Sequence, residues 1–175
     1  MAGYGDKPFG LRDLKLTKID GSVQVDLPYG MTLSFKERVT SGELRGDDAT
    51  VSVVAITDAA EWSIEAGGIS LEAYALMTGR SVVTAGTTPN RTTTLSANAG
   101  DNFPYFKIYG KSVGDNATDD IHVKINKAKL LSAPEGDFKD GEFFMLKCSG
   151  VAVDPGSGAI FDIVQNETAA NLPSS

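Results

Sequence analysis

One histidine and one cysteine, His122 and Cys148, are the first candidates for catalysis in this chain. A Cys–His pair forms an activated nucleophile when the two side chains lie side by side. Cys148 stands between Leu146 and Gly150 in an apolar run, where an inert buried thiol is the usual outcome. His122 alternates with apolar residues, which predicts a side chain that faces solvent. We therefore do not expect an enzyme.

Metal binding is the second kind of chemistry to consider. Two possible nitrogen or sulfur ligands in one chain are too few for a zinc site. Asp115, Asp119 and Asp120 form an acidic turn, but their spacing differs from that of known calcium loops. We expect a solvated turn at this place, and no metal or other cofactor.

Three further patterns have the form of binding motifs. Residues 45–47 spell Arg-Gly-Asp, an integrin-type tripeptide that arises often by chance. Residues 156–158 are glycine-rich but lack the lysine and the following helix of a phosphate loop. Trp62 and the aromatic residues at 103–109 suggest base stacking, but their alternation favours core packing. The net charge of −7 argues against a protein that grips phosphate backbones.

The bulk properties indicate one soluble domain. A length of 175 residues fits a single domain, and one cysteine excludes an intrachain disulfide framework. The first ten residues lack the basic region and apolar run of a secretory signal. No apolar stretch approaches membrane-spanning length, so we expect synthesis in a cytosol and no membrane insertion.

Most of the chain has the pattern of short strands. Residues 11–19, 23–27 and 31–35 alternate between apolar and polar positions, which predicts an antiparallel meander with one solvated face. A hairpin is expected from residues 143–153 and 159–164, and a bulge near Lys127. Together with strands expected near 91–97, 103–109 and 121–125, the chain should hold about eight to ten strands.

The stretch from residue 49 to 79 predicts two strands and the one convincing helix. Residues 50–57 are apolar on both faces, which is typical of a strand covered on both sides. After a bend, alternation from residue 60 to 66 places Trp62 and Ile64 in the core. A helix is expected to be capped by Ser70, to pack through Tyr74 and to end at Gly79.

Residues 38–48 are polar and charged and show no clear period, which predicts a long loop between two strands. This loop is either a mobile surface loop or an arm that reaches a neighbouring subunit. Residues 1–10 predict an N-terminal arm, and residues 166–175 predict a polar C-terminal tail.

Two extended segments resemble major tail tube proteins of long-tailed bacteriophages. The middle of those proteins is similar to SGELRGDDATVSVV followed by AEWSIEAGGISLEAYALMTG. Their C-terminal part is similar to DFKDGEFFMLKCSGVAVDPGSGAIFDIVQNETAANLP. The resemblance implies a single domain over residues 1–175 with the tail tube fold. That fold is mainly β, a β-sandwich or partly rolled barrel with one flanking α-helix.

The resemblance also implies a structural role in the virion. Subunits made in the bacterial cytoplasm would form hexameric rings, and stacked rings would form a tail tube that carries DNA into the host. Further copies, the tape-measure protein and the tail terminator and tip proteins are the expected partners, and double-stranded DNA passes without tight binding. Two alternatives remain open: a tube protein of a contractile tail or a bacterial injection or secretion system, and a monomeric virion decoration or binding β-sandwich.

Within this interpretation two sets of residues have expected roles. The N-terminal arm, the C-terminal tail and the 38–48 loop should make contacts between subunits or rings. The loop residues expected in those contacts are Thr40, Ser41, Glu43, Leu44, Arg45, Asp47 and Asp48. The polar residues expected to face the lumen are Gln24, Asp26, Thr32 and Ser34.

Overall fold

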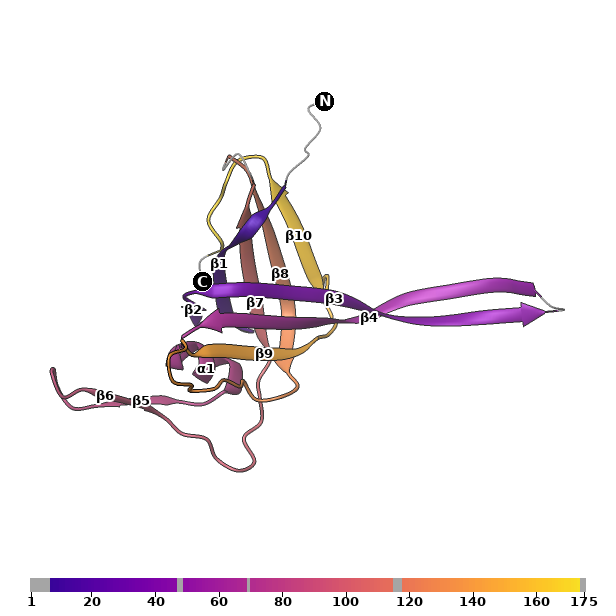
Figure 1. Cartoon of the computed structure of the whole chain (residues 1–175). Helices are drawn as coiled ribbons and strands as arrows, with labels where there is room; N and C mark the ends of the chain where they lie inside the picture. The colour runs from indigo at the N-terminus through magenta and orange to yellow at the C-terminus, as the bar shows by residue number, and fades with distance from the viewer. Residues whose placement is uncertain (1–6, 47–48, 69, 115–117, 174–175) are drawn as a thin grey trace.

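The computed structural model describes residues 7–46, 49–68, 70–114 and 118–173 (Figure 1). This part of the chain is mainly β, as predicted, with ten strands and one short helix. The strands are β1 (Phe9–Lys18), β2 (Gln24–Asp26), β3 (Gly30–Gly46), β4 (Ala49–Gly67), β5 (Val82–Ala85), β6 (Thr92–Leu95), β7 (Phe106–Val113), β8 (Asp120–Leu130), β9 (Met145–Ala152) and β10 (Phe161–Asn166), and the helix is α1 (Leu71–Thr78).

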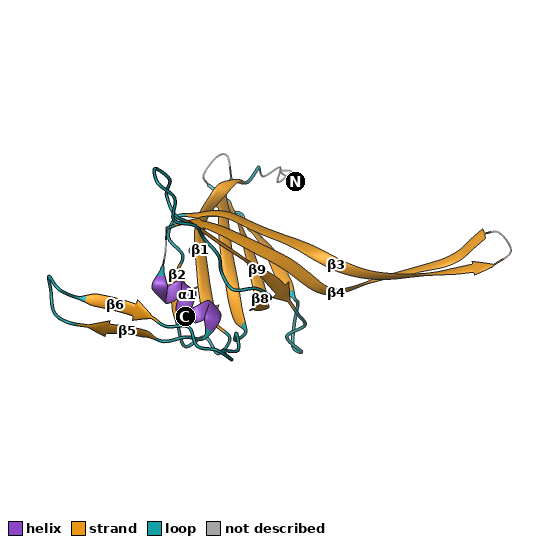
Figure 2. Cartoon of the chain, turned by 60° about the horizontal axis from the view of Figure 1, so that its bottom comes forward, coloured by secondary structure: helices purple, strands orange, loops and turns teal. Residues whose placement is uncertain are grey.

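Eight of the strands form one large antiparallel sheet. Their order is β2-β1-β7-β8-β9-β4-β3, and β10 pairs with β8 beside this path. The sheet divides at β8, because residues 120–125 of that strand pair with β10 and residues 128–130 pair with β9. β5 and β6 form a separate hairpin, which leaves the body in a different direction from the β3–β4 hairpin (Figure 2).

Aromatic contacts show that the two parts of the sheet pack face to face. The ring of Trp62 on β4 meets Phe106 on β7 edge-on, with 5.6 Å between the ring centres. Phe35 on β3 lies 5.4 Å from Phe161 on β10. β3 is the last strand of the order and β10 branches from β8, so this contact requires the sheet to be folded over on itself around the core.

The core contains the residues whose alternation predicted burial. Those on β4 are Ala60, Trp62, Ile64 and Ala66, and Tyr74 of α1 is partly buried against them. α1 begins after Ser70, whose Oγ accepts a hydrogen bond from the Ala73 N–H at 3.2 Å. It ends at Gly79, whose φ of 73° is the left-handed conformation that glycine adopts without strain. Both ends are where the sequence predicted them. At eight residues, this one helix of the described chain is too short to cross a membrane.

The prediction of a long loop at residues 38–48 is wrong for every one of those residues that the structure describes. β3 continues to Gly46 and pairs with β4 from Gly30↔Ala66 to Gly46↔Ala49. The bend expected within residues 49–67 does not interrupt the strand, because β4 is continuous. At this place its pairing with β3 shifts register, between Arg38 and Val39 of β3. No core lies under the outer part of this ribbon, so its side chains show no periodicity although its two strands pair with each other. Asp47 and Asp48 lie outside the described residues.

Two predicted strand pairings also differ from the structure. The third strand of the expected meander pairs with β4 and not with β2. β10 pairs with β8 and not with β9, so the predicted hairpin between residues 143–153 and 159–164 is wrong. The side-chain amide of Asn126 on β8 helps to fix this pairing, because it donates to Ala159 O at 2.8 Å and to Asp162 Oδ2 at 2.9 Å.

The bulge predicted near Lys127 is confirmed. Phe106 pairs with Ala128 and Ile108 pairs with Ile125, so β8 has one extra residue at this place. The prediction that the strand at 50–57 is covered on both sides is wrong in the single chain, since those side chains are exposed.

Candidate self-association surfaces

His122 and Cys148 lie in separate surroundings. Cys148 on β9 is opposite Ile64 of β4, and its Sγ is 3.8 Å from the sulfur of Met77. Burial raises the pKa of the Cys148 thiol to about 12, so the thiol is protonated at neutral pH. His122 on β8 is only 12% exposed, and its Nε2 lies 3.1 Å from Asp120 Oδ2. The predicted exposure of His122 is therefore wrong, because the ring packs against the buried carboxylate of Asp120.

Asp120 is buried and anchors the C-terminal tail. Its Oδ1 accepts from the Asn166 side chain at 2.6 Å, and its Oδ2 accepts from the Ala170 N–H at 2.7 Å and lies 3.0 Å from Lys111 Nζ. Burial raises the pKa of Asp120, but these hydrogen bonds outweigh it and lower the pKa to about 2. The prediction of a solvated turn is therefore wrong for Asp120, which is buried. Asp115 lies outside the described residues. The part of the chain that the structure describes holds no group of three or more His, Cys, Asp or Glu that fits a metal ion.

The C-terminal tail lies along its own domain. Ala169 donates its N–H to Thr118 O at 2.8 Å, and Gln24 Nε2 donates to Pro173 O at 2.8 Å. Leu172 is buried. The tail thus runs from β10 to β2, across strands of one part of the sheet.

The outer part of the β3–β4 hairpin projects from the body as an arm (Figures 1 and 2). We define the arm as residues 39–46 and 49–57, beyond the register shift at Arg38 and Val39. Eight extended residues reach about 26 Å at ~3.3 Å per residue. Its root is held by Arg38, whose guanidinium contacts the Asp58 carboxylate at 2.9 Å.

Both faces of the arm carry exposed aliphatic side chains among polar ones. Cross-strand partners share a face, so one face holds Val39, Val53 and Ala55, and the other holds Leu44, Val54 and Ile56. Six aliphatic side chains of the arm are between 50% and 67% exposed: Val39, Leu44, Val51, Val53, Val54 and Ile56. The sequence predicted that a strand of this composition is covered on both sides, and within one chain nothing covers it.

Five of the seven loop residues predicted to contact other subunits lie on this arm, and the other two, Asp47 and Asp48, lie outside the described residues. Thr40, Ser41, Glu43, Leu44 and Arg45 are exposed on β3, and Glu43 pairs with Arg45 at 3.5 Å. The Arg-Gly-Asp tripeptide begins at the end of β3. The other strand of the arm, residues 50–57 of β4, was not predicted from the sequence as a contact surface. Its apolar composition is the pattern that could have indicated one.

The residues predicted to face a lumen are not brought together on one surface. Gln24 and Asp26 lie on β2, at one end of the strand order, and Thr32 and Ser34 lie on β3 at the other end. Gln24 is held by Thr17 and by the C-terminal tail, and Asp26 lies 3.5 Å from Lys15. Thr32 and Ser34 are exposed and alternate with the core residues Leu33 and Phe35. They therefore belong to the polar outer face of β3, β4 and β9.

No protein-family model matches this chain, and no curated protein matches it. The function is therefore argued from the surfaces described above.

Proposed function

We propose that this chain is a self-assembling tube subunit, the major tail tube protein of a long-tailed phage. In this proposal copies form hexameric rings, the rings stack into a tube, and the tube delivers the genome in the virion. The large antiparallel sheet, the flanking helix and the projecting ribbon support this proposal, and so does the resemblance of the sequence to tail tube proteins.

The observation that carries the proposal is the two-faced apolar arm. A two-stranded ribbon alone is marginally stable in water, and this one exposes aliphatic side chains on both of its faces. Covering six such side chains supplies on the order of 6 kcal/mol, if each gains about 1 kcal/mol from the remaining burial. Another copy of the chain is the partner that a closed or stacked assembly always provides.

The polar outer face of β3, β4 and β9 is the surface that we assign to the lumen. Thr32, Ser34 and Ser63 are small and polar, and the charges beside them include the pair Glu65 and Lys147 at 3.5 Å. Such a face offers DNA no row of unpaired cations, and each subunit has a net charge of −7. Duplex DNA passing along it would be repelled weakly and not held. Of the four residues predicted for the lumen, this assignment keeps Thr32 and Ser34.

A monomeric binding or decoration module is the rival from another class. It would use the arm on a different protein and would stay small at high concentration. A contractile-tail or injection-machine tube would assemble in the same way, and neighbouring genes for a sheath would separate it from a non-contractile tail tube.

The test is assembly of the wild-type chain and of a variant with a shortened arm. Because Thr40 pairs with Ile56, replacing residues 41–55 by Asn-Gly keeps the register of the remaining hairpin. We expect rings or tubes of the wild-type chain in negative-stain micrographs, and a folded monomer of the shortened chain in sedimentation. The Val54→Ser/Ile56→Ser variant should behave as the shortened chain does.

Val83→Ser is the matched control, since Val83 on β5 is 63% exposed and lies outside the arm. It should assemble as the wild type does. A wild-type chain that remains monomeric at every concentration, also with its companion virion proteins, would refute the proposed function.

A further inference from the structure

A loop between β8 and β9 carries the most exposed aromatic side chains of the described chain. We define the acidic aromatic loop as residues 132–144, in which Phe138 is 83% and Phe143 is 94% exposed. The loop also contains four carboxylates and one lysine, at Glu135, Asp137, Asp140, Glu142 and Lys139. Exposed aromatic residues among charges are typical of an interface and not of a free surface.

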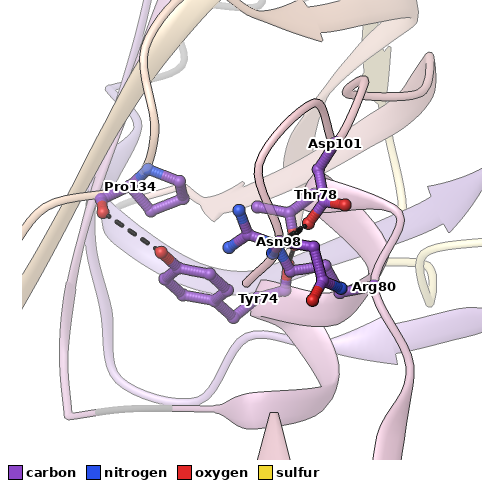
Figure 3. Close-up of polar contacts among 6 residues, drawn as sticks. All are labelled: Tyr74, Thr78, Arg80, Asn98, Asp101 and Pro134. Carbon is purple, nitrogen blue, oxygen red and sulfur yellow. Dashed lines mark hydrogen bonds and ion pairs between the residues drawn. The ribbon is translucent and has the colours of Figure 1, made fainter. Parts of the chain in front are cut away.

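The loop is held in place before any partner binds. The Tyr74 hydroxyl of α1 donates to Pro134 O at 3.5 Å (Figure 3). Glu135 and Lys147 exchange backbone hydrogen bonds at 2.9 and 2.8 Å. The ring centres of Phe144 and Phe138 are 4.8 Å apart. The Phe144 ring fits against Gly136 because that residue has no side chain, and a Cβ at position 136 would lie 2.3 Å from the ring. A loop fixed at its base loses less conformational entropy on binding.

A groove on another part of the surface is suited to such a loop. It has a volume of about 590 Å³, within the usual range of ligand pockets, and lies between α1, the β1–β2 turn and the start of β5. Its apolar lining includes Ile19, Val23, Val25, Leu76, Val82 and Tyr105.

One wall of the groove is fixed by the network around Arg80 (Figure 3). Arg80 contacts the Asp101 carboxylate at 2.9 Å and lies over the Tyr74 ring at 5.9 Å. Asp101 also accepts from the Asn98 N–H at 3.0 Å. The same tyrosine therefore holds both the base of the loop and a wall of the groove.

The groove has a positive edge in a negatively charged chain. Lys127 and Lys129 each place their Nζ 5.1 Å from the centre of the Tyr105 ring, and Lys18 lines the groove directly. Two carboxylates, Asp20 and Glu72, also line it. Asp20 is already hydrogen-bonded by the N–H and the hydroxyl of Ser22, at 2.9 and 2.7 Å, and Arg80 is neutralised by Asp101. The lining itself holds Lys18 and Arg80 with Asp20 and Glu72, and Lys127 and Lys129 add two positive charges beside it, whereas carboxylates exceed lysine in the loop.

We propose that the acidic aromatic loop of one copy inserts into this groove of the next copy. The proposal rests on the proposed function, because it names a second contact of the same self-assembly. Phe138 and Phe143 fill the apolar lining, and the loop carboxylates face Lys18, Lys127 and Lys129. The two surfaces differ, so the contact is head-to-tail and each copy both offers a loop and receives one. Such contacts close into a ring or continue into a filament.

The direct test is a disulfide between two full-length variants, each with one added cysteine. Mixed Phe143→Cys and Ile19→Cys chains should yield a cross-linked heterodimer under mild oxidation. Cys148 is buried and does not compete. The control pairs Phe143→Cys with Val83→Cys, because Val83 is 63% exposed against 44% for Ile19 and does not line the groove. A cross-link to residue 83 in place of residue 19, or to neither, would overturn the proposed contact.

The second test is assembly. Phe138→Ser/Phe143→Ser should raise the concentration needed for assembly at least tenfold, whereas Leu131→Ser, 74% exposed beside the loop, should not. Lys127→Glu/Lys129→Glu should weaken assembly, and adding Asp140→Lys/Glu142→Lys to the same chain should restore it.

The outcomes separate this contact from the proposed function. Normal tubes from the Phe138→Ser/Phe143→Ser chain, together with loss of tubes in the arm variant, would overturn the loop contact and leave the tube function standing. A cross-linked dimer at residues 143 and 19 from a wild-type background that never forms tubes would support the loop contact and refute the tube function.

Discussion

The two halves of strand β4 have similar residues and opposite surroundings. From residue 60 to 66, alternate side chains are buried in the core, and Ile64 is 1% exposed. From residue 50 to 57 the strand is at least as apolar, yet Ile56 is 62% exposed. Both halves pair with β3, and the inner half also pairs with β9 from Ala60 to Gly67. The two halves therefore differ both in packing and in backbone pairing, because the outer half has β3 on one edge and no strand of the described chain on the other.

This difference indicates what each half is for. The inner half buries its side chains within one chain and stabilises the domain. The outer half contributes little to the domain and has a composition suited to burial, so its packing must come from outside the chain. Substitutions in the inner half should act on the free energy of unfolding, and substitutions in the outer half should act on assembly.

The largest effect on stability is expected in the inner half. Ile64→Ala should lower the free energy of unfolding by about 2–5 kcal/mol, because it leaves a cavity beside Trp62 and Cys148 in the core. Urea unfolding of the monomer at low concentration measures this. A change below ~0.5 kcal/mol would contradict the assignment of the inner half to the core.

A smaller effect is expected from the anchor of the C-terminal tail, which belongs to the domain and not to the arm. The pKa of Asp120 is about 2, below its ordinary value of 3.8. The ionised form is therefore favoured by folding, so its contribution is present above about pH 4 and is lost as the pH falls towards 2. It amounts to about 2 kcal/mol.

Asp120→Asn should remove this dependence. The loss of unfolding free energy between pH 5 and pH 2 should be smaller in the variant than in the wild type by about that amount. Parallel acid profiles of the two chains would show that Asp120 does not hold the tail by its charge.

The helix cap that follows the inner half should have a third, smaller effect. Ser70→Ala removes the acceptor of the Ala73 N–H and should lower stability by about 1 kcal/mol. Ser70→Gly should cost only a few tenths of that, because glycine suits the same position. Thermal unfolding followed by circular dichroism measures both, and equal losses in the two variants would argue against the cap.

The smallest effect on the monomer is expected in the outer half, at the residue that matches Ile64. Ile56→Ala should change the free energy of unfolding by less than ~0.5 kcal/mol, because its side chain is already in water. The same variant should raise the concentration needed for tube formation, as measured by light scattering. A destabilised monomer with normal assembly would reverse the roles given to the two halves.

Local signals in the sequence were sufficient for several elements. Ser70 and Gly79 fix the ends of α1 through the hydrogen bond and the backbone angle of single residues. The alternation around Trp62 and Ile64 predicted burial because a half-buried strand must place every second residue in the core. The bulge near Lys127 was visible as a slip in the same alternation.

The arm could not be predicted as a strand from its side chains. The residues from Thr40 to Arg45 have no core beneath them, so nothing selects a period of two, and their polarity had the appearance of a loop. The side of the arm formed by residues 50–57 was predicted as a strand, but its exposure was not. A pattern of apolar residues states that burial is favourable and does not say which chain provides it.

By itself, the sequence determined the ends of the helix, the turns and the alternation of buried and exposed residues, because these features depend on residues a few positions apart. The tertiary structure decided that β10 joins β8, that β3 continues to Gly46 and that the C-terminal tail reaches Asp120. Any two strands form the same backbone hydrogen bonds, so the choice of partner depends on how the whole chain packs. The exposure of the arm, the feature that suggests assembly, belongs to this second group for the same reason.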